Sequence, residues 1–430
     1  MQVEAWLSRA ARTRPGSTAL EGPDGGCSYA ELHACARRSA IALRARGVTA
    51  GDRVLIVLPP GLAFARAFHA CLLLGAVAVP CDVRLGPAER ALVCAGAAAV
   101  VEEPLEEKSA PEALDGDLVH DLDAVAAVIH TSGTSAAPRP VELTYGNFLW
   151  SALGSAVALD RDPRERWLCA LPVSHVGGLS ILVRSAIYAT TAVVHPRFDA
   201  DLVLRALREQ GITLVSLVAT TLARLLDAGL RRPPTLRCAL TGGGPVPAAL
   251  IERARAAGVP VSPTYGLTEA CSQVTTGGPP LFCTRVRVAE DGEILVAGPT
   301  VAPASLASDG WLHTGDLGEL DADGCLRVTG RKGDTIVSGG ENVAPAEVEA
   351  VLEAHPDVLE AAVLGRADPR WGEAVAAIVF ARPGSGVEAE TLRAHCEQRL
   401  APYKVPKQLE LVGEPLPRTP SGKLLRRALT

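Results

Sequence analysis

The sequence predicts an α/β protein with a large N-terminal domain of layered mixed and parallel sheets with helices. That domain includes a small β-rich subdomain, and a small mobile α+β C-terminal domain follows it. One observation indicates the large domain: buried apolar runs alternate with helical segments through the first 250 residues, as in parallel sheets covered by helices. A second observation indicates the other two parts: short alternating strands begin near residue 285, before helices and strands alternate again.

The individual elements follow from this periodicity. Residues 29–48 have the apolar spacing of an amphipathic helix that ends at Gly47, and residues 102–121, acidic and with prolines, indicate a surface loop. Buried strands are expected at 54–58, 76–80, 125–129, 192–195, 214–218 and 237–240, with helices at 63–74 and 201–210. This β-α-β order favours parallel pairing.

The C-terminal third changes character twice. Short strands are expected at 293–296 and 326–329, and the change back to longer elements follows residues 331–334. We therefore expect a large N-terminal domain over residues 1–330, a hinge at 331–334 and a small C-terminal domain over 335–430.

Composition excludes several classes of function. The 430 residues carry a net charge of −6, which argues against a nucleic-acid or anionic-membrane partner. The most apolar stretch, 70–80, is too short to span a bilayer, and charges in residues 1–15 argue against a signal peptide. The eleven cysteines are scattered without metal-ligand spacing, so we expect a cytoplasmic protein.

The most informative segment follows the strand at 125–129. Residues 131–135 supply four hydroxyls and a glycine, and a turn of this kind can surround a phosphate group with donors. The segment lacks the Gly-Lys-Ser/Thr ending of a Walker A loop. On its own, it is more typical of an ordinary turn than of a phosphate site.

Four further motifs follow it in order. They are Tyr-Gly-Leu-Thr-Glu at 265–269, Gly-Trp-Leu-His-Thr-Gly-Asp at 310–316, Gly-Arg-Lys-Gly-Asp at 330–334 continuing to 339–342, and Pro-Ser-Gly-Lys at 420–423. As an ordered set, they resemble the adenylate-forming superfamily of acyl-CoA synthetases, luciferases and adenylation domains. The resemblance implies an enzyme that uses ATP and Mg²⁺ to convert a carboxylic acid to an acyl adenylate, and then transfers the acyl group to CoA.

The resemblance also assigns roles to the residues of the phosphate segment. It implies that the phosphates of ATP contact Thr131, Ser132, Gly133, Thr134, Ser135 and Arg139, with Thr131 also counted as catalytic. The segment departs from the family pattern because Ala136 and Pro140 replace glycines and Arg139 replaces a lysine. Arginine still pairs with phosphate, whereas the loss of two glycines should stiffen the loop.

The remaining motifs supply the rest of the implied nucleotide site. Glu269 resembles the Mg²⁺ ligand and is a candidate catalytic residue, and Asp316 with Arg331 resembles the pair that binds the ribose. The implied adenine slot comprises Gly243, Gly244, Pro245, Tyr265, Gly266 and Thr268.

The C-terminal motifs have implied roles in the chemistry and in domain movement. Lys423 resembles the lysine that bridges the carboxylate and ATP during adenylation. Gly333 and Asp334 are expected in a hinge, and Gly339, Gly340 and Glu341 in the segment that enters afterwards to help form the CoA tunnel.

Segments at 171–185, 237–245 and 268–273 are similar to the o-succinylbenzoate–CoA ligase family of menaquinone biosynthesis. An aromatic keto acid with two carboxylates is thus the expected substrate. Arg184 is a charge inside an apolar run and is expected to hold the second carboxylate, directly or through a neighbour, unless it lies on a helix surface. His175, Ser272 and Gln273 are expected to line the acid pocket.

Alternative interpretations remain open at this point. The chain could be a synthetase for another aryl or fatty acid, an adenylating enzyme that loads a carrier protein, or a non-catalytic nucleotide-binding relative. The small-molecule partners expected in each case are ATP and, for the enzymes, an acid and a thiol. A homodimer is a further expectation.

Overall fold

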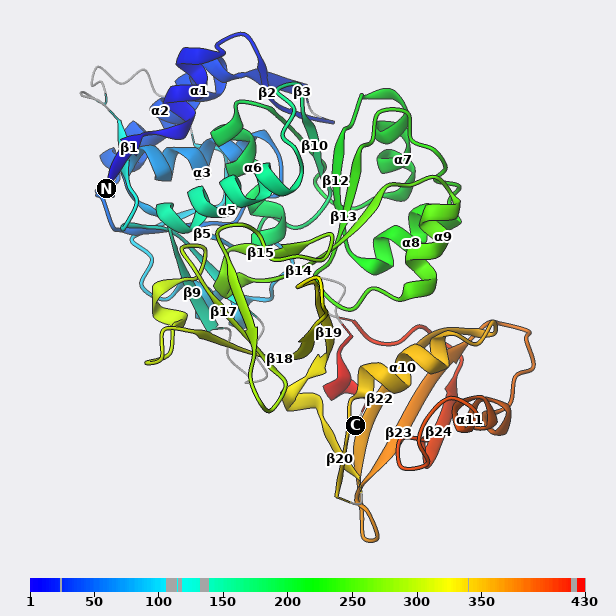
Figure 1. The fold of residues 1–430 in the computed structure, drawn as a ribbon. Helices are drawn as coiled ribbons and strands as arrows, with labels where there is room; N and C mark the ends of the chain where they lie inside the picture. Colours follow the sequence, from blue (N-terminus) through cyan, green and yellow to red (C-terminus); the bar gives the residue numbers. More distant parts are fainter. Residues whose placement is uncertain are drawn as a thin grey trace.

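The computed structural model describes residues 1–23, 25–105, 114, 118–131, 139–338, 340–418 and 424–429. Sheets and helices are layered as the sequence predicts, and Figure 1 shows the C-terminal sheet at the lower right, below the other sheets. Among the described residues, no helix has the length and apolar character needed to cross a membrane.

An eight-stranded sheet forms the largest layer. Its strand order is β15-β14-β13-β12-β10-β11-β2-β3, parallel throughout except for the antiparallel edge pairs β14–β15 and β2–β3. The strands are β2 (Thr18–Gly22), β3 (Gly25–Ser28), β10 (Arg166–Cys169), β11 (Thr191–Val194), β12 (Leu214–Leu217), β13 (Cys238–Thr241), β14 (Val261–Leu267) and β15 (Ser272–Thr276). One face is covered by α7 (Ala200–Glu209), α8 (Ala219–Asp227) and α9 (Ala248–Ala256).

A five-stranded sheet forms a second layer, and the main hydrophobic core lies between it and the eight-stranded sheet. Its order is β6-β4-β5-β8-β9, and only the β8–β9 pair is antiparallel. Its strands are β4 (Arg53–Ile56), β5 (Val77–Pro80), β6 (Ala99–Val101), β8 (Val125–Thr131) and β9 (Arg139–Thr144). The helices that contribute to the main core are α1 (Trp6–Thr13), α2 (Tyr29–Ala45), α3 (Leu62–Leu74), α5 (Tyr145–Ala158) and α6 (Val176–Tyr188).

Local sequence explains where these helices begin and end. The Ser28 hydroxyl accepts from the Glu31 amide, and the Glu31 carboxylate accepts from the Ser28 amide, a capping box that begins α2. Gly75 ends α3 with a φ of +74°, a conformation that glycine adopts at no steric cost. Two peripheral elements complete this part: α4 (Pro87–Cys94) and the pair of β1 (Gln2–Glu4) with β7 (Val119–Asp121).

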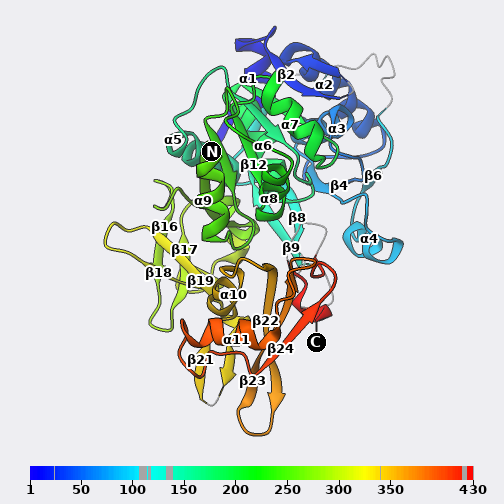
Figure 2. The same ribbon diagram turned by 90° about the vertical axis from the view of Figure 1, so that its right-hand side faces the viewer.

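The C-terminal third contains two smaller sheets. The first is an antiparallel meander of β16 (Arg285–Val288), β17 (Glu293–Ala297), β18 (Leu312–Leu320) and β19 (Leu326–Arg331). The second comprises β20 (Ile336–Ser338), β21 (Glu341–Val343), β22 (Val358–Asp368), β23 (Gly372–Ala381) and β24 (Gln408–Val412). This second sheet shares a separate core with α10 (Pro345–Glu353) and α11 (Ala389–Glu397). Figure 2 shows this assembly at the bottom of the molecule.

The predicted strands and helices are confirmed to within one to three residues at their ends. The prediction of a loop over the whole of 102–121 is wrong at its end, because 119–121 form β7 and pair with β1. Several elements were not predicted, among them helices α1, α5, α8 and α9 and strands β2, β6 and β9.

Candidate functional site

The clearest polar arrangement joins β14 to the β18–β19 hairpin. The Tyr265 hydroxyl donates to Asp316 Oδ2 at 2.8 Å, and Arg331 Nε lies 3.5 Å from Asp316 Oδ1. Asp316 and Arg331 face each other in the strand register. Burial, with Asp316 adding to it, raises the pKa of Tyr265, so the phenol remains a donor to the carboxylate. Three residues from separate motifs therefore meet at one carboxylate.

Glycine at position 266 is a steric requirement of the β14–β15 hairpin. A Cβ atom there would lie 1.7 Å from the Ser272 carbonyl oxygen, and the register shifts between Tyr265 and Gly266. Tyr-Gly-Leu-Thr-Glu therefore spans the end of a strand and the turn after it. Tyr265 and Gly266 lie in a strand, and the turn is the short 3₁₀ helix η1 (Thr268–Ala270) that carries Thr268 and Glu269.

Glu269 has the features of a single-carboxylate ligand. It is half-buried, and its carboxylate makes no hydrogen bond or ion pair within the part of the chain that the structure describes. Its backbone oxygen accepts from the Ala302 amide at 2.8 Å, which holds the turn in place. Across the described residues, no three His, Cys, Asp or Glu residues gather as metal ligands. One carboxylate suits Mg²⁺, because water molecules and phosphate oxygens supply most of the ligands of this ion in proteins.

The turn after β13 packs tightly against the strand that carries Tyr265. A Cβ atom at Gly242 would lie 2.5 Å from the Thr264 carbonyl oxygen, so no larger residue fits. Gly243 has a φ of +80°, while Gly244 is exposed with no atom within 4 Å of its notional Cβ. Gly243, Gly244 and Pro245 thus present open backbone beside β14, as a flat ring would require.

The phosphate segment is described only at its two ends. Thr131 is the last residue of β8, and its hydroxyl donates to the Arg139 carbonyl at 3.4 Å. Arg139 and Pro140 pair with Thr131 and His130 as the start of β9, rather than continuing the loop. The remaining predicted residues of this segment, Ser132, Gly133, Thr134 and Ser135, lie outside the described residues, as do Gly339 and Lys423.

Arg184 is buried inside α6, so the interpretation as a surface arginine is wrong. Its side chain is 3% exposed, and its guanidinium lies 5.5 Å from the centre of the Trp167 ring. Arg184 Nη2 donates to Ser151 Oγ at 3.0 Å, and Ser151 Oγ donates to the Cys271 carbonyl at 2.6 Å. Burial lowers the pKa of Arg184, because no anion compensates the charge within the described residues.

The other predicted pocket residues lie around the same region. His175 precedes α6 as its N-cap and is half-buried. Ser272 follows Cys271 with a φ of +93°. Gln273 is buried, its Nε2 donates to Thr276 Oγ1 at 2.9 Å, and its Oε1 has no partner among the described residues.

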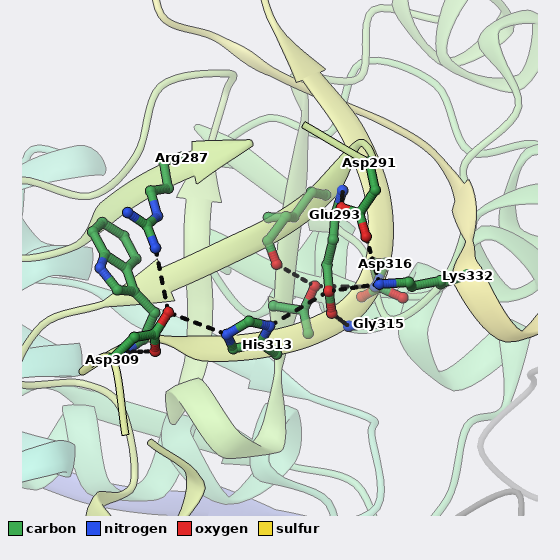
Figure 3. Close-up of polar contacts among 11 residues, drawn as sticks. Arg287, Asp291, Glu293, Asp309, His313, Gly315, Asp316 and Lys332 are labelled. Carbon is green, nitrogen blue, oxygen red and sulfur yellow. Dashed lines mark hydrogen bonds and ion pairs between the residues drawn. The ribbon is translucent and has the colours of Figure 1, made fainter. Parts of the chain in front are cut away.

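A second polar network lies beside Asp316, and sequence reasoning missed it (Figure 3). Glu293 accepts from the Gly315 amide at 2.9 Å through Oε1 and from Lys332 Nζ at 3.1 Å through Oε2. Asp291 also accepts from Lys332 Nζ, at 2.7 Å. The sequence signal was an acid at the start of β17, a strand that is buried at every position. An acid in such a place needs partners.

The predicted hinge residues Gly333 and Asp334 directly follow Lys332 of this network, whereas the predicted CoA residues Gly340 and Glu341 lie farther along the chain. Gly333 and Asp334 form η3 (Lys332–Asp334), with Asp334 Oδ2 lying 3.4 Å from Arg426 Nη1. Gly340 and Glu341 are exposed where β20 turns into β21. Figure 1 shows β20 near the bottom of the molecule, away from β14, and Figure 2 shows β21 at the bottom as well.

Comparison with known proteins gives concordant matches over the whole chain. Residues 7–305 match the family described as AMP-binding enzyme, and residues 347–423 match AMP-binding enzyme C-terminal domain. The chain is 38% identical over 474 residues to 2-succinylbenzoate–CoA ligase of Bacillus subtilis, covering 99% of this chain and 97% of that protein.

Two solved structures from the same organism are similar in fold. One is o-succinylbenzoate CoA synthetase in complex with the acyl-adenylate intermediate OSB-AMP, with a TM-score of 0.92 and 37% identity over 100% of this chain and 98% of that one. The other is the same synthetase in complex with ATP and magnesium ion, with a TM-score of 0.91 and 37% identity over 100% of both chains.

Proposed function

We propose, from the premise that this chain belongs to the family of AMP-binding enzymes, that it is an AMP-forming acid–thiol ligase. Its reaction converts 2-succinylbenzoate, ATP and CoA to 2-succinylbenzoyl-CoA, AMP and diphosphate, a step of menaquinone biosynthesis. The observation that carries this proposal is the meeting of Tyr265, Asp316 and Arg331 in a chain so similar to that ligase throughout its length.

The chemistry joins two anions. A carboxylate oxygen attacks the α-phosphorus of ATP, the bond from that phosphorus to the bridging oxygen breaks, and diphosphate leaves. Asp316 accepts hydrogen bonds from the ribose hydroxyls, and Tyr265 and the Gly243–Pro245 turn enclose the adenine. Fixing the nucleotide in this way holds the α-phosphorus in line with the attacking oxygen.

Glu269 is the residue that would hold Mg²⁺, since its carboxylate is half-buried and lacks a protein partner within the described residues. A bound Mg²⁺ neutralises charge on the phosphates. Thr131 and the hydroxyls that follow it would contact the outer phosphates, with Arg139 as the cation at the far end of the segment. We assign to Lys423 the stabilisation of charge that develops between the carboxylate and ATP.

The second half-reaction requires a different arrangement. The CoA thiolate attacks the carbonyl carbon of the acyl adenylate, and AMP leaves with the oxygen that came from the acid. We propose that the chain divides at residues 330 and 335, with 331–334 as the hinge. Support comes from the two sheets, which end at Arg331 and begin at Ile336. Rotation there would bring the segment of Gly340 and Glu341 to the site.

The buried charge of Arg184 supports the choice of acid. A buried cation with one neutral hydroxyl partner is costly, and a dicarboxylate supplies an anion beyond the carboxylate that reacts. We propose that Arg184 acts in two ways. Its hydrogen bond to Ser151 helps to position the backbone at Cys271 and Ser272, and its positive charge favours binding of the ring carboxylate of the acid. Ser272, Gln273 and His175 would complete this pocket.

The test is an incubation of the protein with Mg²⁺–ATP, CoA and 2-succinylbenzoate, analysed by mass spectrometry. We expect 2-succinylbenzoyl-CoA and AMP in equal amounts, and the acyl adenylate when CoA is omitted. Asp316→Ala is expected to raise the KM for ATP strongly. Product from benzoate or fatty acids but not from 2-succinylbenzoate would refute the choice of substrate, and nucleotide binding without any AMP formation would refute the enzyme.

We propose further that the protein is a homodimer formed through α5. This helix contains no charged residue, and it exposes the apolar side chains Trp150, Leu153 and Val157. Cys283, which follows the exposed Phe282, lies with its Sγ 3.5 Å from the Trp150 carbonyl oxygen. Figure 2 shows α5 at the left margin of the molecule. In a two-fold symmetric dimer, the same surface of both subunits forms the interface. An uncharged surface such as α5 therefore avoids like-charge repulsion between two chains that each carry a net negative charge.

Sedimentation should test this interface. Two copies of the patch would bury roughly 800 Å² in total, at the low end for a specific interface, so we expect a dimer that weakens on dilution. Leu153→Glu should give a monomer, whereas Leu202→Glu, at an exposed position on α7, should not. A monomeric wild type at high concentration would contradict the proposal. We also propose a cytoplasmic location, because all eleven cysteines are free thiols.

A further inference from the structure

The hinge and the proposed ribose site share one buried carboxylate. Glu293 is 7% exposed, and its two oxygens have different partners: Oε1 accepts from the Gly315 amide, and Oε2 accepts from Lys332 Nζ. Gly315 precedes Asp316, and Lys332 begins η3. Figure 3 shows Glu293 between these two groups.

The Glu293 carboxylate is kept ionised by both of its partners, the Gly315 amide and the Lys332 ammonium group. Burial alone would raise the pKa of Glu293, but the Gly315 amide and Lys332 hold it below the ordinary value. The carboxylate is therefore ionised, and His313 Nδ1, 3.5 Å from Oε2, is the other basic group beside it. Loss of Lys332 from this position would leave a buried anion with less compensation.

Backbone geometry explains how Glu293 affects Asp316, the residue whose carboxylate is proposed to bind the ribose. Gly315 has a φ of +70°, and the register of β17 with β18 shifts between Glu293 and Leu295. The Asp316 amide in turn donates to Thr314 Oγ1 at 3.0 Å, and Thr314 Oγ1 donates to the Ile294 carbonyl at 2.8 Å. The backbone before Asp316 is thus fixed by β17 at two neighbouring positions.

We propose that Glu293 is a positioning residue for Asp316 and that its ion pair with Lys332 makes nucleotide affinity depend on the position of the hinge. This inference rests on the proposed function for the assignment of Asp316 and of the hinge. In the orientation described here, Lys332 holds Glu293, and Glu293 holds the turn that orients Asp316. Rotation about 331–334 displaces Lys332, which loosens the turn and favours release of AMP after thioester formation.

Coupling of this kind is reciprocal. If the hinge orientation changes the affinity for AMP, bound AMP must shift the hinge equilibrium by the same factor. Bound nucleotide would then stabilise the orientation in which Lys332 contacts Glu293, and release of nucleotide would free the C-terminal part to move.

Calorimetric titration with AMP is the test. Lys332 is half-exposed, so Lys332→Met should fold normally, and we expect its Kd for AMP to rise roughly five- to tenfold. Lys332→Arg should restore most of the affinity. Asp291→Asn removes the exposed partner of the same lysine and should change the Kd less than twofold. Glu293→Gln combined with Lys332→Met should be no weaker than the weaker single variant.

Several outcomes would overturn the inference. These are an unchanged Kd for AMP in Lys332→Met, additive effects in the double variant, or a fall in melting temperature without a change in AMP affinity. The proposed function is tested independently of this inference. A wild-type protein that binds AMP but forms no acyl-CoA would refute the ligase activity, and the AMP titrations of the variants could still be interpreted. Breaking the exposed Arg327–Glu319 pair on the same sheet provides a matched control and should leave the Kd unchanged.

Discussion

Replacing Tyr265 by Phe removes one hydroxyl and leaves the ring that faces the proposed adenine slot. The lost bond is charge-assisted, because the phenol donates to Asp316 Oδ2 at 2.8 Å and Asp316 is 18% exposed. Such bonds contribute about 1.5–3 kcal/mol. Arg331 remains 3.5 Å from the other oxygen, so we take the lower end of that range. A loss of about 1.5 kcal/mol corresponds to a roughly tenfold higher Kd for AMP.

Calorimetric titration with AMP and steady-state kinetics provide the assay. Tyr265→Phe should raise the Kd for AMP and the KM for ATP while kcat changes little. The variant loses a hydrogen bond that orients the Asp316 carboxylate toward the ribose, but no group that acts on the reacting atoms. Tyr145→Phe is the control: this hydroxyl donates to the Leu72 carbonyl at 3.0 Å in the core and should affect only the melting temperature. An unchanged AMP affinity in Tyr265→Phe would refute the reasoning that this bond orients Asp316.

Three further predictions concern the acid pocket, the C-terminal part and the β14–β15 hairpin. Arg184→Met should raise the KM for 2-succinylbenzoate at least tenfold with little change for ATP, and should not affect an analogue without the ring carboxylate; equal effects on both acids would contradict the role. Burial, with Glu349 adding to it, raises the pKa of Glu353 to about 7, so the folded state binds a proton that the unfolded state lacks between about pH 4.5 and 7. Stability should fall as pH rises through that window, and Glu353→Gln should stabilise by about 1–3 kcal/mol more at pH 8 than at pH 5; the same shift in melting temperature at both pH values would refute this. Gly266→Ala should cost about 3–5 kcal/mol, because its Cβ would collide with the Ser272 carbonyl, whereas Gly16→Ala, in open space, should be neutral; equal melting temperatures would show that the hairpin adapts.

Hydrophobic periodicity was sufficient to predict several of the parallel strands and helices, among them β4, β5, β12, α3 and α7. Strands β4 and β5 and helix α3 lie within one or two residues of the prediction, since strands buried on both faces give continuous apolar runs. Helix α5 lacks this contrast because Trp150, Leu153 and Val157 are exposed and apolar, so its two faces are alike.

The site was predictable where its residues belong to local motifs. Tyr265, Asp316 and Arg331 each lie in a short string, and the structure brings all three together. Glu293 was not predictable in this way, because its partners lie 22 and 39 residues away along the chain. Arg184 was recognised as a buried charge, but its route through Ser151 depends on the packing of α5 against α6.

The most direct test of the proposed chemistry follows an oxygen atom. The reacting carboxylate of 2-succinylbenzoate would be labelled with ¹⁸O, the protein supplied with Mg²⁺–ATP and CoA, and the products analysed by mass spectrometry. Because the acid oxygen attacks phosphorus and then leaves with AMP, we predict one ¹⁸O atom in each AMP and none in the diphosphate. Acyl-CoA formed with unlabelled AMP, or with ADP and labelled phosphate, would contradict the acyl-adenylate mechanism.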